Sequence, residues 1–283
     1  MSSGSCALVL AIACAPDEPA RDIPPVVWSG EHLDFAPQDG APEICEGTLS
    51  YMDQYVALLA DVMRVELDGP VVYVLGSEQG PDLCNVEGAL GCAFDDAVYA
   101  RVAPQEHELV HGVRAFDGFS HVFFDEGAAE VFGDDADVAL RVPANGDLLE
   151  GIEAGRPTGG LGSMWYPRAG HFAAYLHDRH GPDVTVALLR RTDPYSSAQE
   201  AIEVLEEATG MEFDELRTEY EAEPVCEQAR YRYPLHGCNE PAALRERCDG
   251  STAVFIDERI ACDDPTTVGP RDGELWKYIA FEV

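Results

Sequence analysis

Lysine is almost missing from this chain: its 283 residues include 18 basic and 53 acidic side chains, and Lys277 is the single lysine. The formal net charge of −35 argues against nucleic acid or an anionic membrane surface as a partner, because like charges repel. The chain also lacks a Cys-x-x-Cys pair, which argues against a cysteine zinc knuckle. The glycine-rich stretch 76–91 lacks the Lys and Ser/Thr spacing of a phosphate-binding loop, so we expect a disulfide-held loop there.

No apolar run is long enough to span a bilayer, and the run at residues 6–13, "CALVLAIA", is short and followed by Cys14. This arrangement resembles a bacterial lipoprotein signal, although no basic residue precedes the run and Ala11 stands where Leu is usual. The resemblance implies a signal peptide at 1–13, lipidation of Cys14 and a Pro-rich tether at 14–25. An ordinary secretory signal is the alternative. Both predict an exported protein, periplasmic or extracellular if it is not lipid-anchored.

Nine cysteines agree with export, because disulfides form in oxidising compartments. Cys84 and Cys92 are close enough to close one loop. The last four cysteines could form two disulfides among themselves: Cys226, Cys238, Cys248 and Cys262. Cys45 would then be left over, so either it is free or this pairing is wrong.

The pattern of apolar residues predicts an α+β fold. Strands are expected at 31–36 and 69–76, and a loop followed by a strand is expected near 85–103. Helices are expected at 48–67, 104–116, 120–133, 166–183, 198–210 and 212–223. Pro104 would open the second helix, while Ser120 would cap the third and Gly133 would end it.

The residue pattern changes after Pro224. Short segments of alternating apolar and polar residues then lie between cysteines and turn residues, at 229–235, 251–257 and 274–283. We therefore expect a mainly helical domain with a small N-terminal sheet over 26–223. A small disulfide-stapled β module would follow it over 224–283.

The stretch "HELVH" carries the chemistry. His107 and His111 are four residues apart, so on a helix both imidazoles leave the same face and can reach one Zn²⁺. Glu108 follows the first His and can act on a metal-bound water as a general base. The alternative is that these residues form a solvated polar face of the helix. A third metal ligand elsewhere in the chain would favour the zinc site over this alternative.

Two residues compete for that third position. Asp117 lies six residues after His111, but the sharp turn it needs would fall on Arg114, where a non-glycine residue is strained. Glu126, in "FFDEGAAE", is favoured on this argument. Gly127 beside it would let the second helix approach the first. Glu130, one turn on, can accept a hydrogen bond from the free ring nitrogen of a ligand His.

"HELVH" followed by "FFDEGAAE" resembles the gluzincin metallopeptidases, in particular small bacterial members, over roughly residues 45–222. The resemblance implies that Glu126 is the third zinc ligand. The stretches "YPRAGHFAAYLHDRHG" and "TGMEFDELRTEYEAE" are similar to later helices of that family. One departure is His171, where those relatives more often have a small residue, which leaves the shape of the cleft beside Tyr166 open.

The expected function is that of an exported zinc metallopeptidase with one Zn²⁺ per chain, held by His107, His111 and Glu126, and acting on a peptide or protein substrate. Glu108 would be the base, and Tyr166 is the candidate donor to the oxyanion, with a partly buried packing role as its alternative. A catalytically silent gluzincin-like lipoprotein that serves as a binding or assembly module is the other reading. A closed structural zinc site is disfavoured because it would normally have a fourth side-chain ligand. The remaining helical histidines are expected on the surface or at helix ends: His121, His171, His177 and His180.

Overall fold

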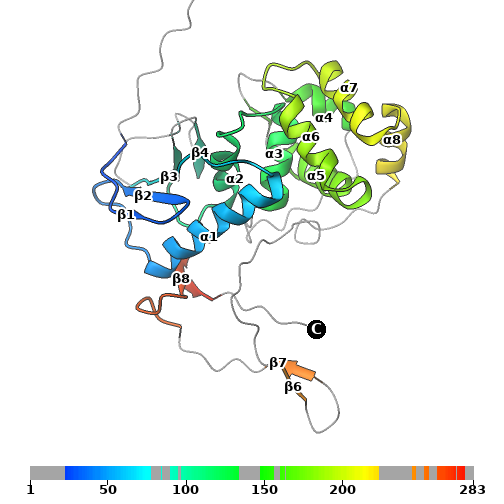
Figure 1. Ribbon diagram of the computed structural model, residues 1–283. Helices are drawn as coiled ribbons and strands as arrows, with labels where there is room; N and C mark the ends of the chain where they lie inside the picture. The colour runs from blue at the N-terminus through cyan, green and yellow to red at the C-terminus, as the bar shows by residue number, and fades with distance from the viewer. Residues whose placement is uncertain are drawn as a thin grey trace, which may run out of the picture.

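The computed structural model describes residues 23–77, 84, 90–94, 97–133, 147–155, 160–162, 164–222, 244–246, 252–254, 260–271 and 273–277. Within them the chain forms eight helices (Figure 1). These are α1 (Glu46–Met63), α2 (Glu106–Arg114), α3 (Val122–Phe132), α4 (Leu148–Ala154), α5 (Tyr166–His180), α6 (Pro182–Arg191), α7 (Ala198–Thr209) and α8 (Phe213–Glu221). None of these helices is both long enough and apolar enough to cross a bilayer.

Five strands form the main sheet: β1 (Trp28–Ser29), β2 (Leu33–Pro37), β3 (Val71–Leu75), β4 (Gly91–Ala93) and β5 (Val98–Ala100). Their order is β1-β2-β3-β5-β4, with parallel pairing of β2 with β3 and of β3 with β5, and antiparallel edges. Two further pairs lie in the C-terminal part: β6 (Leu244–Glu246) with β7 (Thr252–Val254), and β8 (Val268–Arg271) with β9 (Glu274–Trp276). The predicted mixture of helices and a small N-terminal sheet is therefore confirmed.

The main sheet has buried side chains on both faces, because successive side chains of a strand point to opposite sides. On β3, Tyr73 and Leu75 face one way and pack with α1 and α2 in the larger core. Val74 faces the other way, where Tyr99 of β5 and the partly buried Cys84 join it in a smaller cluster. The predicted disulfide Cys84–Cys92 is confirmed, and it joins Cys84 to edge strand β4.

The helices from α3 to α8 form the other half of the main body, to the right of the sheet in Figure 1. Their core is aromatic, with Phe123, Phe172 and Tyr220 packed together. Helix α3 belongs to both halves, because Phe123 lies in this aromatic core while Ala128 and Phe132 lie in the core against α1 and α2. The segment that carries Glu126 is thus buried between two cores.

Several helix ends differ from the expected ones. Pro104, which follows a cis peptide bond, does not open α2: the helix begins two residues later, at Glu106. His121, and not Ser120, is the N-cap of α3, where its side chain accepts from the amide of Phe123; Gly133 does end the helix. Helices α4 and α6 and strands β1, β6 and β8 were not predicted. For α6 the reason is that Gly181 takes a left-handed φ of 88° and Pro182 then opens a new helix instead of a loop.

The C-terminal part departs most from expectation. Cys262 forms a disulfide with Cys45, at the N-cap of α1, so the predicted pairing of Cys262 within the tail is wrong. In Figure 1, β8 lies directly against the first turn of α1. The tail around residues 262–269 is thereby fastened to the main body. The boundary near 224 stays a prediction, because residues 223–243 lie outside the described ranges.

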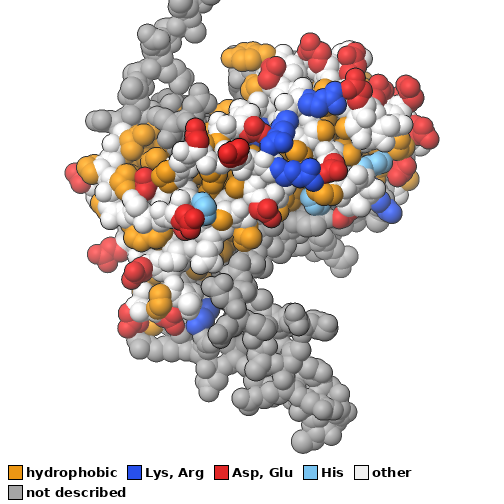
Figure 2. Space-filling view, in the orientation of Figure 1, with side chains coloured by type: hydrophobic (Ala, Val, Ile, Leu, Met, Phe, Trp, Pro, Cys, Tyr) orange, Lys and Arg blue, Asp and Glu red, His pale blue; other side chains and the backbone are white. Residues whose placement is uncertain are grey.

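Other predictions also fall outside the described residues: the signal at 1–13, Cys14, most of the tether, Cys226, Cys238 and Cys248. The acidic character of the chain is visible on its surface. Figure 2 shows acidic side chains over both halves of the visible face, with basic ones gathered near its middle. Among the exposed arginines of α6, Arg190 forms an ion pair with Asp117, and Arg191 forms one with Glu207. The surface is thus a solvated acidic one with local ion pairs.

Candidate metal centre

Three side chains from α2 and α3 meet at one point. His107 and His111 lie one turn apart on α2, and their Nε2 atoms are 3.3 Å from each other. Each Nε2 lies 3.2 Å from the same oxygen, Oε2 of Glu126 on α3. The three potential ligand atoms fall within 4.8 Å of one another, which makes this group able to hold a metal ion.

The separations themselves test the fit. A tetrahedral ion with bonds of 2.0–2.1 Å to each ligand places its ligand atoms about 3.3 Å apart, from the geometry of the tetrahedron. The three observed separations are 3.2, 3.2 and 3.3 Å, so one ion fits equidistant from all three atoms. Two facing ring nitrogens and a carboxylate oxygen form a common donor set for a divalent metal. The predicted grouping of His107, His111 and Glu126 is therefore present in the folded chain.

Each histidine contacts a second carboxylate through Nδ1, the ring nitrogen that does not face the metal position. Nδ1 of His107 lies 3.4 Å from Oε1 of Glu130, as the sequence suggested for Glu130. Nδ1 of His111 lies 3.1 Å from Oδ2 of Asp125, a contact that the sequence analysis missed. An acceptor at Nδ1 keeps the proton on that nitrogen and leaves Nε2 free to bind a metal. Both rings are thus held in the orientation that a metal site needs.

Asp125 is itself fixed on its other side. Its Oδ1 accepts from the hydroxyl of Ser120 at 2.9 Å and from the amide of Ser120 at 3.3 Å. Arg114 lies 3.6 Å away, wholly buried, and donates to the carbonyls of Gly118 and Leu189 at 2.6 Å each. Burial raises the pKa of Asp125, but the hydrogen bond from His111 and the charges of His111 and Arg114 lower it overall. Asp125 is therefore an ionised, immobile acceptor for His111.

The charges of the group are strongly coupled. Burial would lower the pKa of His107, but its hydrogen bonds to Glu126 and Glu130 outweigh burial and raise that pKa from 6.5 to about 9. Burial likewise opposes ionisation of Glu126, yet His111 and His107 hold the pKa of Glu126 far below its usual range. Without a metal, the cluster therefore keeps a proton on His107 at neutral pH as a substitute cation.

Glu108 lies beside the ligands but does not belong to the group. Its side chain is 8% exposed, and burial raises its pKa, although the neighbouring His107 and His111 partly offset this effect. It packs against Gly91 of edge strand β4, where a Cβ would come within 2.5 Å of Glu108 Cγ. Gly91 therefore leaves the space that Glu108 occupies. A buried carboxylate with a raised pKa is suited to accepting and returning a proton.

Tyr166 is the first residue of α5 and lies beside the ligands. Its ring stacks on His107, with centroids 5.9 Å apart and planes 22° apart. Burial, together with the charge of Glu126 and a hydrogen bond to it, raises the pKa of Tyr166 well above 10. The hydroxyl therefore keeps its proton and can donate a hydrogen bond near the metal position.

Asp117, the competing ligand, is not brought to the group. Its Oδ2 accepts from Nε of Arg190 at 2.8 Å, and Arg114 lies 3.6 Å away. Helix α2 runs through Arg114 without a sharp turn, since Ala115 after it is also helical. Other histidines have structural contacts: His121 caps α3, and Nδ1 of His171 lies 3.0 Å from the Tyr220 hydroxyl.

One expectation about packing is wrong. Gly127 does not bring α3 close to α2: a Cβ there would come within 2.7 Å of the carbonyl oxygen of Ala169, on α5. The close approach to α2 occurs at Gly133, where a Cβ would come within 2.7 Å of the Cα of His107. Gly127 in the middle of α3 and Gly133 at its C-cap thus let this helix pack tightly on α5 and on α2.

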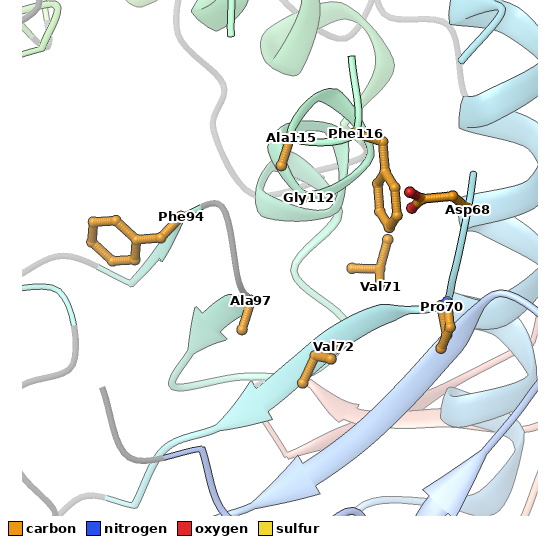
Figure 3. Close-up of a pocket in the computed structure, with 9 residues that line it drawn as sticks. All are labelled: Asp68, Pro70, Val71, Val72, Phe94, Ala97, Gly112, Ala115 and Phe116. Atoms are coloured by element: carbon orange, nitrogen blue, oxygen red, sulfur yellow. The ribbon is translucent and has the colours of Figure 1, made fainter. Parts of the chain in front are cut away.

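A separate cavity of about 270 Å³ lies at the far end of α2. Figure 3 shows Phe94 on one side of it and Phe116, Asp68 and Val71 together on the other. None of the three potential metal ligands lines this cavity. It is therefore distinct from the metal centre.

No protein-family model and no curated protein matches this chain. The geometry of the His107, His111 and Glu126 group and its surroundings is therefore the basis for assigning a function.

Proposed function

We propose that this protein is a zinc metallopeptidase that hydrolyses peptide bonds, with Glu108 as its general base. The observation that carries the proposal is a group of three ligand atoms at tetrahedral spacing with a buried carboxylate beside it. Two imidazoles and one carboxylate leave the fourth position of a zinc ion for water, as catalytic zinc sites require. The same features support the resemblance to gluzincins.

Each residue has a distinct task in this proposal. Zinc, when bound, lowers the pKa of a coordinated water toward about 7 and polarises the substrate carbonyl. Glu108 accepts the proton of the attacking water and returns it to the leaving amine. Tyr166 donates a hydrogen bond to the oxygen that becomes negative. Asp125 and Glu130 hold the two imidazoles in the tautomer that leaves Nε2 free.

We further propose that the protein is exported and anchored by a lipid on Cys14. The two disulfides support an oxidising compartment, where such bonds persist. In the native host, Cys14→Ser should release the protein from the membrane fraction. A wild type that is already fully soluble and begins at another residue would rule out the anchor.

The function is tested by separating metal binding from catalysis. His111→Ala and Glu126→Ala should lose zinc in metal analysis of the purified protein, because each removes a ligand. Glu108→Gln should keep its zinc, while cleavage of a broad peptide library falls about a hundredfold or more. Glu153→Gln, an exposed glutamate of α4, is the matched control and should change neither.

Two outcomes would contradict the assignment. If Glu108→Gln loses zinc as readily as Glu126→Ala, the division between base and ligand is wrong. If the wild type holds zinc but cleaves no peptide, the protein is better described as the silent binding or assembly lipoprotein.

A further inference from the structure

The C-terminal segment of residues 260–271 and 273–277, called the clasp below, is built onto the first turn of α1. The Cys45–Cys262 disulfide joins the two covalently, and the amide of Cys45 donates to the carbonyl of Gly269 at 2.8 Å. The hydroxyl of buried Thr48 accepts from the amide of Gly269 at 2.9 Å. Gly47 leaves no gap, since a Cβ there would come within 2.4 Å of the Thr267 carbonyl. The clasp is therefore fixed in place by α1.

From this position the clasp reaches the helix that carries the metal ligands. Nη2 of Arg271, at the end of β8, donates to Oε2 of Glu106 at 2.9 Å. Glu106 is the first residue of α2 and is 0% exposed, while the side chain of Arg271 is 14% exposed. The hydroxyl of Tyr51 on α1 donates to the other oxygen of Glu106 at 3.2 Å. The Glu106 carboxylate thus accepts hydrogen bonds from both α1 and the clasp.

The contacts of Tyr51 and Arg271 with Glu106 matter for the metal centre because of where Glu106 lies in α2. His107 and Glu108 follow it directly, within the same first turn of α2. A buried carboxylate needs its cation, since an uncompensated charge in the interior moves or takes water in. If Glu106 moved, the backbone of the first turn would move with it. The Nε2 of His107 and the carboxylate of Glu108 would then leave the positions described above.

We propose that Arg271 is a positioning residue for the metal centre, acting through Glu106 on the turn that carries His107 and Glu108. The part concerning Glu108 rests on the proposed function, whereas the part concerning His107 requires only metal binding. The C-terminal segment is on this view a part of the metal centre, although Arg271 lies 165 residues from Glu106 in the chain.

The positive charge of Arg271, taken alone, predicts the opposite effect on zinc affinity from a positioning role, so a measurement of affinity distinguishes the two. Arg271 is a cation near a site for a cation, so its removal should strengthen zinc binding if only long-range electrostatics mattered. A purely structural role would lower thermal stability and leave the affinity of the folded protein for zinc unchanged. A positioning role weakens zinc binding despite the lost positive charge.

The test compares Arg271→Met with Thr48→Val in the full-length protein. Thr48→Val removes the hydrogen bonds between Thr48 and Gly269 but leaves the Cys45–Cys262 disulfide and the contact of Arg271 with Glu106 in place, so it controls for stability. Zinc affinity is measured by competition with a chelator, and the visible spectrum is recorded after loading Co²⁺ in place of zinc. Arg271→Met should bind zinc about tenfold more weakly or worse, the order seen for outer partners of metal ligands. Its Co²⁺ spectrum should change, while Thr48→Val should keep the wild-type affinity and spectrum.

An Arg271→Met variant that binds zinc as tightly as the wild type, or more tightly, overturns the proposal. So does an equal loss in Thr48→Val at an equal shift in Tm. If Arg271→Met does not fold, Arg271→Lys replaces it. Lys keeps the charge but loses the planar fork of Arg, so a loss of a few fold is expected and unchanged affinity overturns the proposal. If the wild type binds zinc but cleaves no peptide, the peptidase proposal is wrong. The positioning role of Arg271 can still be tested in that case, because zinc affinity measures it.

Discussion

Replacing Asp125 with Asn should weaken metal binding without removing a ligand. The change is nearly isosteric, and the oxygen that accepts from Ser120 can stay in place. At the other oxygen, 3.1 Å from Nδ1 of His111, the amide NH₂ of Asn would stand where an acceptor is needed. Two donors would then face each other in a site where Asp125 is only 5% exposed, so water cannot easily relieve the conflict. His111 would favour the tautomer with its proton on Nε2, the wrong one for binding.

The expected cost is a loss of about 10–100-fold in zinc affinity, or ~1.4–2.7 kcal/mol, the range found for outer partners of metal ligands. Chelator competition at pH 7.5 measures it directly. Asp117→Asn is a closely matched control, because Asp117 and Asp125 each lie 3.6 Å from Arg114, but only Asp125 contacts a ligand. Asp117→Asn should change the affinity less than twofold. The reasoning is refuted if the two variants lose the same amount, or if Asp125→Asn binds zinc as the wild type does.

Two other predictions concern the base and the protons of the site. Gly91→Ala should lower peptide cleavage while zinc stays bound, because the new Cβ would stand 2.5 Å from Cγ of Glu108 and displace it; undiminished turnover would contradict this packing. Metal-free protein should lose stability as pH rises from about 6.5 to 9. The pKa of His107 is raised from 6.5 to about 9 in the folded chain, so its contribution is complete below 6.5 and lost as pH passes through 9. A Tm of the chelated protein that stays flat or rises over this window would show that the sign is wrong.

The central part of the site could be predicted from the sequence because its signals are local. The spacing of His107 and His111 fixes their common face on any helix, and Glu126 lies on the next helix along the chain. Asp125 was missed although it directly precedes Glu126. Its role depends on how α3 is rotated against α2, and this rotation is set by the cores on both sides of α3.

The C-terminal part could not be predicted in the same way. Cysteine spacing favoured pairing within the tail, yet Cys262 joins Cys45, because connectivity follows the folded path and is not written in sequence distance. The partnership of Arg271 with Glu106 has no local signal either. Only the packing of β8 on α1 brings these two residues together.

The Cys45–Cys262 disulfide turns most of the chain into a covalent ring that contains both ligand helices, and its two cysteines have a sequence separation of 217. A ring of this size restricts the unfolded chain by about 5 kcal/mol in the chain-entropy account. The disulfide also changes the outcome of a cleavage of the backbone. A peptide bond cut anywhere between residues 45 and 262, by another protease or by the protein itself, would release no fragment until the disulfide was reduced. The nicked molecule would run as one band without reductant and as two with it.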